Sequence, residues 1–286
     1  MLTKNVFFLF VFSVCFCSPN LLASQINSSS TITLAHTDGA TLLTKKALLA
    51  QTTKAKLVNA IDKACNVDCV NPFGKLLGQV DGVKSYSNCK STCVAAEYSF
   101  LNLFTKEVTI HRNNPNPELF HYIGLTHQCV QFARKWWMMN KGITFGSIDS
   151  AYEIIYLTEG KQLRSDATFA LARSINGSAN RPPKRGDLLI YSPDLSRVNW
   201  RHGHVAVVVE VDLSAGTIAI AEENYNNQVW DQPKSYSRKI KITKTADGYL
   251  ITDEDKNHEK NKSLGIISGW LYPLSENSNL PRPKRG

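Results

Sequence analysis

Long apolar runs, internal repeats and nucleic-acid motifs are missing from most of this sequence. Beyond the first two dozen residues, no run approaches the ~20 apolar residues that span a bilayer, so we expect no membrane span in the mature chain. No segment repeats at a fixed period. No nucleic-acid-binding motif is present, so nucleic acid is not an expected partner. The hydrophobic fraction of 43% is ordinary for a globular protein.

The one strongly apolar run stands at the start of the chain. Lys4 precedes Val6–Cys17, twelve mostly apolar residues, and small residues follow at Ala23 and Ser24. The run is too short to span a bilayer, and its order of charge, apolar run and small residues is typical of a secretory signal peptide. We therefore predict a leader over residues 1–23 and an exported protein, periplasmic or secreted.

Composition divides the remainder into three parts. Residues 24–71 are expected to form a flexible and helical extension, with helix over 44–63. Residues 72–274 are expected to form the main domain, and 275–286 a basic tail. The formal net charge is +9, a modest basic balance that favours attraction to the anionic polymers of a cell envelope or to an acidic target; a merely soluble surface is the alternative.

Five cysteines remain after removal of the predicted leader, an odd number. Four of them form two Cys-x-x-x-Cys pairs: Cys65, Cys69, Cys89 and Cys93. In an oxidising compartment these four are expected to form two disulfides, although their spacing does not determine the connectivity. A zinc site is the alternative, but the spacing is not that of a zinc ribbon. Cys129 is left over as a free thiol.

A helix is predicted around that fifth cysteine. Apolar residues recur at helical spacing between Thr126 and Gly142, and Gly142 supplies a stop signal. Cys129 then lies in the first turn, where free backbone N–H groups and the helix dipole favour a thiolate. A thiolate there would be a nucleophile, whereas a buried structural cysteine is the alternative.

Two later segments carry the groups that a cysteine nucleophile needs. His204 begins an apolar strand, and the next strand ends with Glu222, followed by Asn224. Thiol acyl transfer requires a histidine base and a third group that orients it. A loop centred on Leu213 predicts that Glu222 lies directly opposite His204 on one face of the sheet. A surface charge is the alternative for Glu222, and Asn224 is a lesser candidate for the orienting role.

Two other histidines compete as the base. His127 lies two residues before Cys129 at the helix entry, where its side chain is expected to point away. His202 alternates with His204 along the strand and is therefore expected on the other face. A metal site made of Cys129, His202 and His204 would need both histidines on one face, so we predict no metal.

The fold class follows from the order of predicted elements. Asp81-Gly82 predicts a hairpin, and Ser147 is predicted to cap a helix over Ile148–Leu157, with further helical turn over Thr168–Ile175. After Gly186 strands dominate, at 187–191, 204–211, 217–222, 236–242, 249–252 and 264–271. Helices followed by strands indicate an α+β domain in which the N-terminal helices pack on an antiparallel sheet.

These segments together resemble the cysteine, histidine-dependent amidohydrolase/peptidase (CHAP) family, and most closely its glutathionylspermidine amidase branch. The shared pieces, in order, are Gln128-Cys129-Val130-Gln131-Phe132-Ala133-Arg134-Lys135, Gly203-His204-Val205-Ala206 and Ala221-Glu222-Glu223-Asn224. Shorter pieces, among them Tyr236-Ser237-Arg238, extend the resemblance from Phe73 to Pro273. Gln131 stands where the family pattern has Glu, and the ATP-dependent synthetase half found in that branch has no counterpart here.

The resemblance implies a papain-like fold and a cofactor-free hydrolase. Cys129 would be the nucleophile, His204 the base and Glu222 the orienting acid, and the side chain of Gln128 would join a backbone N–H in the oxyanion hole. The expected substrate is a peptide or peptide amide. Peptidoglycan-type peptides are the first expectation because of the predicted export, and a polyamine amide of the glutathionylspermidine type is the second. A latent binding module that has kept the fold is the alternative to an enzyme.

Overall fold

The sequence of helix α2, Cys129–Lys141, determines where this helix begins and ends. It is the one α-helix in residues 65–254 and 266–274, which the computed structural model describes. Phe132, Ala133, Trp136 and Trp137 are buried on its inner face, and the chain leaves the helix at Gly142 with a φ of 66°. The predicted helix and its glycine stop are confirmed, and Cys129 is its first residue.

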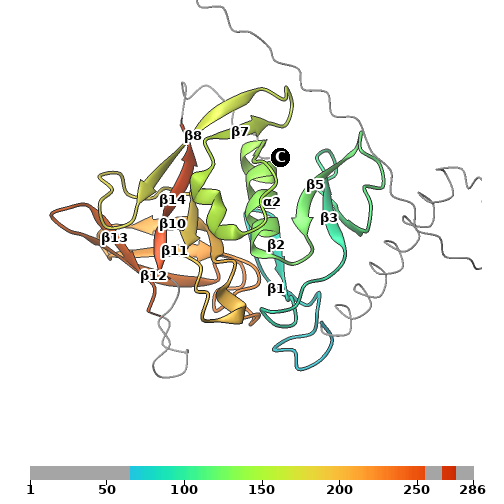
Figure 1. The fold of residues 1–286 in the computed structure, drawn as a ribbon, viewed down its shortest axis with the longest axis horizontal. Helices are drawn as coiled ribbons and strands as arrows, with labels where there is room; N and C mark the ends of the chain where they lie inside the picture. Colours follow the sequence, from blue (N-terminus) through green and yellow to red (C-terminus); the bar gives the residue numbers. More distant parts are fainter. Residues whose placement is uncertain (1–64, 255–265, 275–286) are drawn as a thin grey trace, which may run out of the picture. The chain divides into compact units, whose positions relative to one another are not determined.

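Helix α2 packs between two sheets. It contacts β10, His204–Asp212, on one side and β5, Phe120–Leu125, on the other. Figure 1 shows α2 at the centre of the domain, with the strands of the larger sheet on one side and β3 and β5 on the other. The N-terminus of the helix is therefore held by packing on both flanks.

The larger sheet has nine strands in the order β13-β12-β11-β10-β9-β14-β8-β7-β6, and each pairs antiparallel with its neighbours. Its other strands are β6 Ile143–Thr144, β7 Glu159–Gln162, β8 Thr168–Ile175, β9 Leu188–Tyr191, β11 Thr217–Ala221, β12 Arg238–Lys244, β13 Tyr249–Thr252 and β14 Ile267–Pro273. The six strands predicted after Gly186 all exist; β13 has the predicted ends, and the other five differ at one or both ends.

Two smaller sheets precede the helix. Strands β1, Leu76–Val80, and β2, Val83–Tyr86, form a hairpin, and Asp81 and Gly82 turn it with φ values of 52° and 75°. Both turn residues thus have positive φ, the conformation for which Asp-Gly is suited, so the hairpin prediction is confirmed. A three-stranded sheet follows, made of β4 Val108–His111, β3 Tyr98–Asn102 and β5.

The described residues are mostly antiparallel β-sheet, so the prediction of helices before strands is wrong there. Five strands come before α2. Thr168–Ile175 is strand β8 rather than helix, because pairing with β7 and β14 overrides its weak local preference. The helix predicted over Ile148–Leu157 is a 3-10 helix, η1, over Ala151–Tyr156 that begins after Ser150 rather than Ser147.

Three of the segments predicted near the two ends of the chain lie outside the described residues. The predicted leader over 1–23, the helix over 44–63 and the tail over 275–286 lie outside the described residues. Within the described residues, no helix is long and apolar enough to cross a membrane.

Two apolar layers lie on the two faces of the large sheet, and a smaller core cluster contains Leu101, Ile123 and Met138. On β10, Val205, Val207 and Val209 belong to the layer that includes α2, whereas Ala206 and Val208 face the other layer. Both faces of the strand are buried, which explains why its sequence is a continuous apolar run rather than an alternating one. The start of β10 is therefore fixed from both sides, and His204 is the first residue of that strand.

Candidate active site

The nucleophile candidate is placed by a tight turn before α2. His127 has a φ of 58°, Gln128 is extended, and Cys129 begins the helix. The backbone N–H groups of this first turn have no intrahelical acceptors, so they form a positive end beside the sulfur. Cys129 is 9% exposed and is the one free cysteine among the described residues.

The base candidate is held at the mouth of β10. His204 pairs with Tyr191 across the sheet and is 4% exposed. The rings of Tyr191, Trp200 and Tyr225 pack around the imidazole at centroid distances of 5.5, 6.2 and 5.5 Å. These rings shield the imidazole from water and limit its rotation.

Cys129 lies close enough to His204 to form a hydrogen bond with it and to influence its pKa. Burial by itself lowers the pKa of His204. The hydrogen bond to Cys129 and the charge of that sulfur, together with the hydrogen bond to Glu222 and its charge, outweigh burial and raise the pKa to about 9. This raised pKa favours the imidazolium form of His204 at neutral pH.

Glu222 supplies the third group, immediately after β11. Its Oε2 lies 2.8 Å from Nε2 of His204, and the Glu222 side chain is 3% exposed. Because Nε2 is engaged, Nδ1 is the ring nitrogen left to exchange a proton with Cys129. Burial raises the pKa of Glu222, but the charge of Arg238 and the bonds to His204 and Arg238 lower it to about 2.

The predicted pairing of Glu222 directly opposite His204 is wrong, although the predicted contact exists. Val207 pairs with Ala221, and a bulge lies between Val208 and Glu210. Extending this register places Glu222 opposite Ala206, two residues from His204 and on the same face. The contact is thus diagonal, within reach of a long side chain.

The comparisons with known proteins agree with this geometry. Residues 120–224 match the family model of the CHAP domain, a span that contains all three side chains. Over these residues the chain is similar to the CHAP domain. It is 28% identical over 215 residues to the bifunctional glutathionylspermidine synthetase/amidase of Escherichia coli, covering 74% of this chain and 31% of that protein. It is 29% identical over 211 residues to the trypanothione synthetase of Crithidia fasciculata, covering 72% and 28%.

The chain thus spans about a third of the length of the curated relatives that it matches. The family match and the amidase relatives support cysteine amidohydrolase chemistry for the CHAP domain. Cys129, His204 and Glu222 bring together the kinds of side chain that this chemistry needs: a thiol, an imidazole near it and a carboxylate bonded to the imidazole.

Asn224 contacts Gln128 rather than His204. Its Nδ2 donates to Oε1 of Gln128 at 2.8 Å, so the expected orienting role toward the histidine gives way to one toward the residue before the nucleophile. Nε2 of Gln128 in turn donates to the carbonyl of Cys93 at 2.9 Å. One N–H of the Gln128 amide is committed by that bond, and the other is left for a substrate oxygen.

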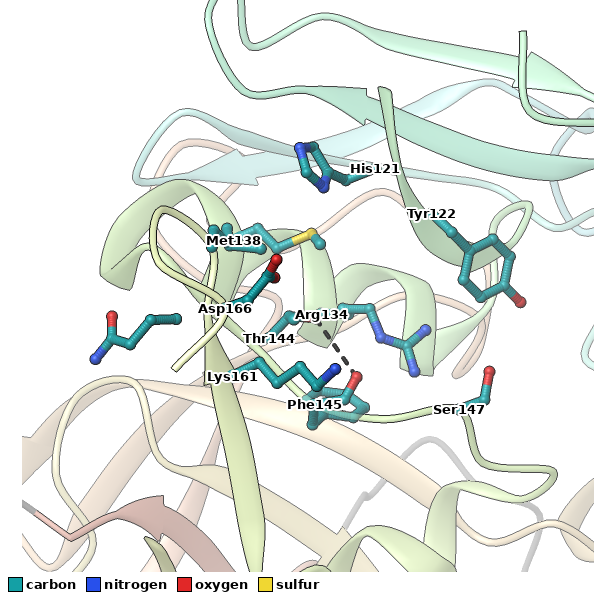
Figure 2. A pocket seen from close by; sticks show the side chains of 11 residues that line it. His121, Tyr122, Arg134, Met138, Thr144, Phe145, Ser147, Lys161 and Asp166 are labelled. Carbon is teal, nitrogen blue, oxygen red and sulfur yellow. Dashed lines mark hydrogen bonds between the residues drawn. The ribbon is translucent and has the colours of Figure 1, made fainter. Parts of the chain in front are cut away.

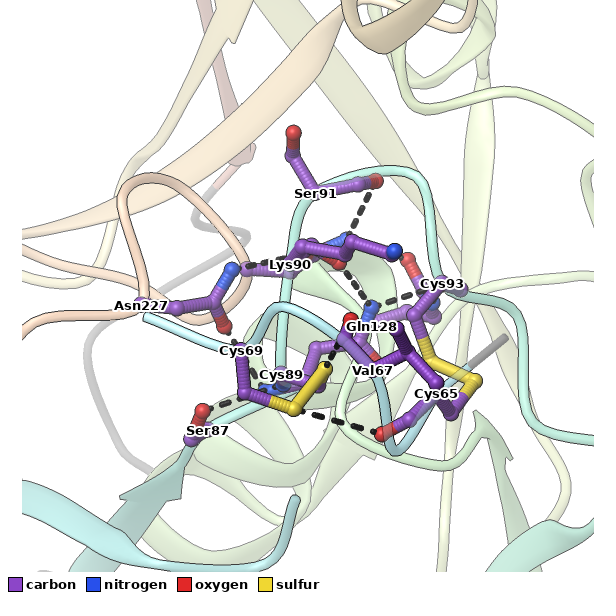
Figure 3. Close-up of a disulfide and its surroundings, with 12 residues drawn as sticks. Cys65, Val67, Cys69, Ser87, Cys89, Lys90, Ser91, Cys93, Gln128 and Asn227 are labelled. Atoms are coloured by element: carbon purple, nitrogen blue, oxygen red, sulfur yellow. Dashed lines mark hydrogen bonds between the residues drawn. A yellow bond between two sulfur atoms is a disulfide. The ribbon is translucent and has the colours of Figure 1, made fainter. Parts of the chain in front are cut away.

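The four remaining cysteines form two disulfides, Cys65–Cys93 and Cys69–Cys89. This confirms the predicted disulfides and establishes the connectivity that spacing left open. All four sulfurs are used, so no thiolates are left for the zinc alternative. Figure 3 shows Gln128 beside Cys93, which links the disulfide loop to the start of α2.

The competing histidines are engaged elsewhere. His127 packs against Phe73 and Tyr86 and lies 3.8 Å from a carboxylate oxygen of Glu223. The Nδ1 of His202 lies 2.8 Å from the hydroxyl of Ser150. Neither arrangement resembles the contact of His204 with Cys129. Within the described residues no cluster of His, Cys, Asp or Glu is arranged to hold a metal ion.

A separate pocket of about 190 Å³ lies beside a different part of α2 (Figure 2). Arg134, Tyr122, Phe145 and Lys161 are among its lining residues, and none of Cys129, His204 and Glu222 is. Arg134 donates to the carbonyls of Ile123 and Gly146 at 2.8 and 2.9 Å, which ties α2 to β5 and to the loop before η1. This pocket belongs to the framework of the CHAP domain rather than to the triad.

Two residues that contact Glu222 were not predicted for the site. Ser237 donates from Oγ to Oε1 of Glu222 at 3.0 Å, and Arg238 donates from Nε to the same oxygen at 2.6 Å. The signal was present, because Tyr236-Ser237-Arg238 is one of the pieces shared with the CHAP family. Sequence alone gave no reason to place them beside Glu222, since β12 pairs with β11 only in the folded sheet.

Proposed function

We propose that this protein is a cysteine amidase in which Cys129 is the nucleophile, His204 the general base and acid, and Glu222 the residue that fixes the imidazole. The observation that carries the proposal is the continuous contact from Cys129 through His204 to Glu222 in a buried setting. Cys129, His204 and Glu222 are each held by a different helix or strand, so their arrangement depends on the whole fold.

In the proposed reaction, Sγ of Cys129 attacks the amide carbonyl and forms a thioester after the C–N bond breaks. The proton on Nδ1 of His204 passes to the leaving amine. Water then loses a proton to His204 and attacks the thioester, which releases the carboxylic acid and restores the thiol. Glu222 stays ionised throughout and stabilises the imidazolium.

The oxyanion of each tetrahedral intermediate needs donors, and two are at hand. The backbone N–H of Cys129 is free at the helix start, and Gln128 keeps one amide N–H after its bond to Cys93. Asn224 holds the oxygen of the Gln128 amide, which leaves its nitrogen as the side that donates.

The first proposed substrate is a peptide amide of the peptidoglycan type, cleaved outside the cytoplasm. The two disulfides support this choice, since such bonds persist in oxidising compartments. The predicted leader supports it as well. The basic balance of the chain favours attraction to anionic envelope polymers.

The second proposed substrate is an amide of the glutathionylspermidine type, in which the leaving group is a polyamine. The relatives favour this substrate, because the Escherichia coli protein is named for glutathionylspermidine and the Crithidia fasciculata protein for trypanothione. We propose that the amidase function in the name of the Escherichia coli relative extends to this chain.

The test uses purified protein without the leader, incubated separately with peptidoglycan stem peptides and with glutathionylspermidine. Mass spectrometry of the products identifies the bond that is cut. We expect wild-type protein to cleave one of them, and Cys129→Ala and His204→Ala to lose at least ~1,000-fold in kcat/KM while remaining folded. Full hydrolytic activity in Cys129→Ala would disprove the mechanism. Release of spermidine without peptide cleavage would select the second substrate. Tight binding without turnover of either would favour a latent binding module.

A further inference from the structure

A buried network extends behind Glu222, where the ends of several strands meet. Arg238 begins β12, Asp253 follows the end of β13, and Tyr191 ends β9. In an antiparallel sheet ordered β13-β12-β11-β10-β9, these positions lie at the same edge as His204 and Glu222. The topology thus gathers five polar side chains at one edge of the sheet.

Arg238 joins two carboxylates within this network. It donates from Nε to Glu222 at 2.6 Å, and its Nη1 contacts both oxygens of Asp253. The guanidinium plane also stacks on the ring of Tyr225 at 3.9 Å. Its side chain is 12% exposed, and those of Glu222 and Asp253 are 3% and 2% exposed. A planar guanidinium held at three sides has one orientation, and so does the carboxylate that it binds.

Tyr191 completes the network and returns it to the catalytic histidine. Its hydroxyl donates to Oδ2 of Asp253 at 2.8 Å and accepts from Nη2 of Arg238 at 3.1 Å. The ring of the same tyrosine packs against the imidazole of His204. The imidazole of His204 thus closes a ring of contacts with four side chains behind it: Glu222, Arg238, Asp253 and Tyr191.

We propose that Arg238 and Asp253 are positioning residues for hydrolysis: Arg238 holds Glu222 in the rotamer that faces Nε2 of His204, and Asp253, with the Tyr191 hydroxyl, holds Arg238. This inference rests on the proposed function of the triad. Neither residue touches the substrate or the reacting atoms. Their effect reaches Cys129 through Glu222 and His204.

The charges of His204, Glu222, Arg238 and Asp253 alternate in sign, so the proposal predicts a measurable change in the titration of His204. The groups that surround His204 are, in direct contact, Cys129, Glu222, Tyr191 and Tyr225, and, behind Glu222, Arg238 and Asp253. Removal of the negative charge of Asp253 leaves the positive charge of Arg238 less compensated. The imidazolium of His204 then becomes less favourable, and His204 releases its proton at a lower pH.

The chain contains a matched control in a second trio of Arg, Asp and Tyr, in which the carboxylate is buried. Arg181 donates to Asp187 through two nitrogens, at 2.6 and 3.3 Å, and stacks on Tyr272 at 3.6 Å. Asp187 is 2% exposed and lies just before β9, at the opposite end of that strand from Tyr191. Asp187→Asn therefore removes a buried, Arg-paired carboxylate without touching the site.

The experiment compares Asp253→Asn, Tyr191→Phe and Arg238→Lys with Asp187→Asn in the protein without its leader. Kinetics on the substrate identified for the wild type give kcat and KM, and the ring resonances of His204 followed by NMR give its titration without substrate. Tyr191→Phe keeps the ring and removes only the hydroxyl, so it tests the network even if a charge variant fails to fold.

We expect the three network variants to lower kcat about tenfold or more with little change in KM, as loss of hydrogen bonds to a charged group predicts. Asp253→Asn should move the His204 titration to lower pH by roughly half a unit or more. Asp187→Asn should lower the melting temperature without either effect. The proposal is overturned if Asp253→Asn and Tyr191→Phe keep the wild-type kcat and His204 titration, or if Asp187→Asn changes them equally. Since wild-type and Cys129→Ala activities are measured alongside, failure of the proposed function would be seen separately, and the NMR titration would still decide the network.

Discussion

The carboxylate of Glu222 lies 2.8 Å from Nε2 of His204, although the two residues are not paired across β10 and β11. This contact and the one with Cys129 raise the pKa of His204 to about 9. The imidazolium is the acid that protonates the leaving amine, so activity should persist up to about pH 9 and fall above it.

Glu222→Gln should move the fall in activity at high pH to a lower pH, because the variant loses the negative charge that stabilises the imidazolium. We expect kcat/KM at neutral pH to fall by about 100-fold or more, as for loss of the orienting acid in other triads. The pH dependence of kcat/KM for the two proteins is the measurement. A fall in activity at the same pH in both proteins would show that Glu222 does not act on His204.

The same pair should make stability depend on pH. The pKa of His204 is raised, so its contribution is full below 6.5 and is lost as pH rises through about 9. The pKa of Glu222 is lowered, so its contribution is present above 4.5 and is lost as pH falls through about 2. Urea unfolding at several pH values should therefore show that the free energy of unfolding depends less on pH in Glu222→Gln than in wild type. Parallel profiles would contradict the coupling.

Gly203 fixes the entry to β10, and its replacement should affect catalysis. It has a φ of 63°, and a Cβ there would lie 2.4 Å from the carbonyl oxygen of Tyr191. Gly203→Ala should destabilise the fold by about 2–4 kcal/mol through backbone strain and overlap, and should lower kcat by displacing His204.

Gly142→Ala is the control for that substitution. Gly142 has a similar φ of 66°, but a Cβ there would meet nothing within 4 Å. We expect a loss of about 1 kcal/mol from strain alone and an unchanged kcat. Thermal melts and kinetics on both variants make the comparison. Equal effects on kcat would mean that the geometry at Gly203 does not position His204.

Asn224 should matter for the oxyanion because it holds Gln128. Asn224→Ala removes one of the two hydrogen bonds that orient the Gln128 amide, and we expect kcat to fall about tenfold while KM changes little, since the donor acts on developing charge. Asn226→Ala, an exposed change in the same loop, is the control. The prediction fails if both variants have the wild-type kcat, or if Gln128→Ala has no effect.

The two disulfides should be separable by their effects on activity. They close loops of similar length, with separations of 28 and 20 residues, so replacing either pair by serines should cost about 3 kcal/mol. The carbonyl of Cys93 accepts from Gln128, and therefore loss of the Cys65–Cys93 bond should lower kcat more than loss of Cys69–Cys89. Melting curves and kcat for the two double variants test this. Equal kcat values would argue against a role for the Cys93 contact.

The parts of the site that depend on local sequence were predictable. The apolar spacing and Gly142 placed Cys129 at a helix start, and the apolar run after His204 placed the histidine at the mouth of a strand. Side chains alternate between the two faces along each strand, and this alternation was enough to put Glu222 on the same face as His204. A two-residue error in register leaves every side chain on its predicted face. The predicted contact of Glu222 with His204 was therefore confirmed although the pairing was wrong.

The parts that depend on contacts between distant segments were not predictable. The bulge after Val208 has no sequence signal, and it alters the register of the hairpin. Asn224 was weighed as a partner of His204, whereas the fold brings it to Gln128. Strand β8 was missed because its stability comes from pairing with β14, a strand far along the chain. No pattern in the sequence links Asp253 to Arg238, since only the sheet order brings the two together.

The position of the nucleophile on α2, well before the strand that carries its base, has a consequence during synthesis. A chain emerging from the ribosome presents Cys129 before β10 and β11 exist, so its sulfur has no proton acceptor and no orienting acid. Hydrolytic capacity arises only when the last strands of the large sheet have docked. The order of translation therefore leaves the proposed triad incomplete until late in synthesis.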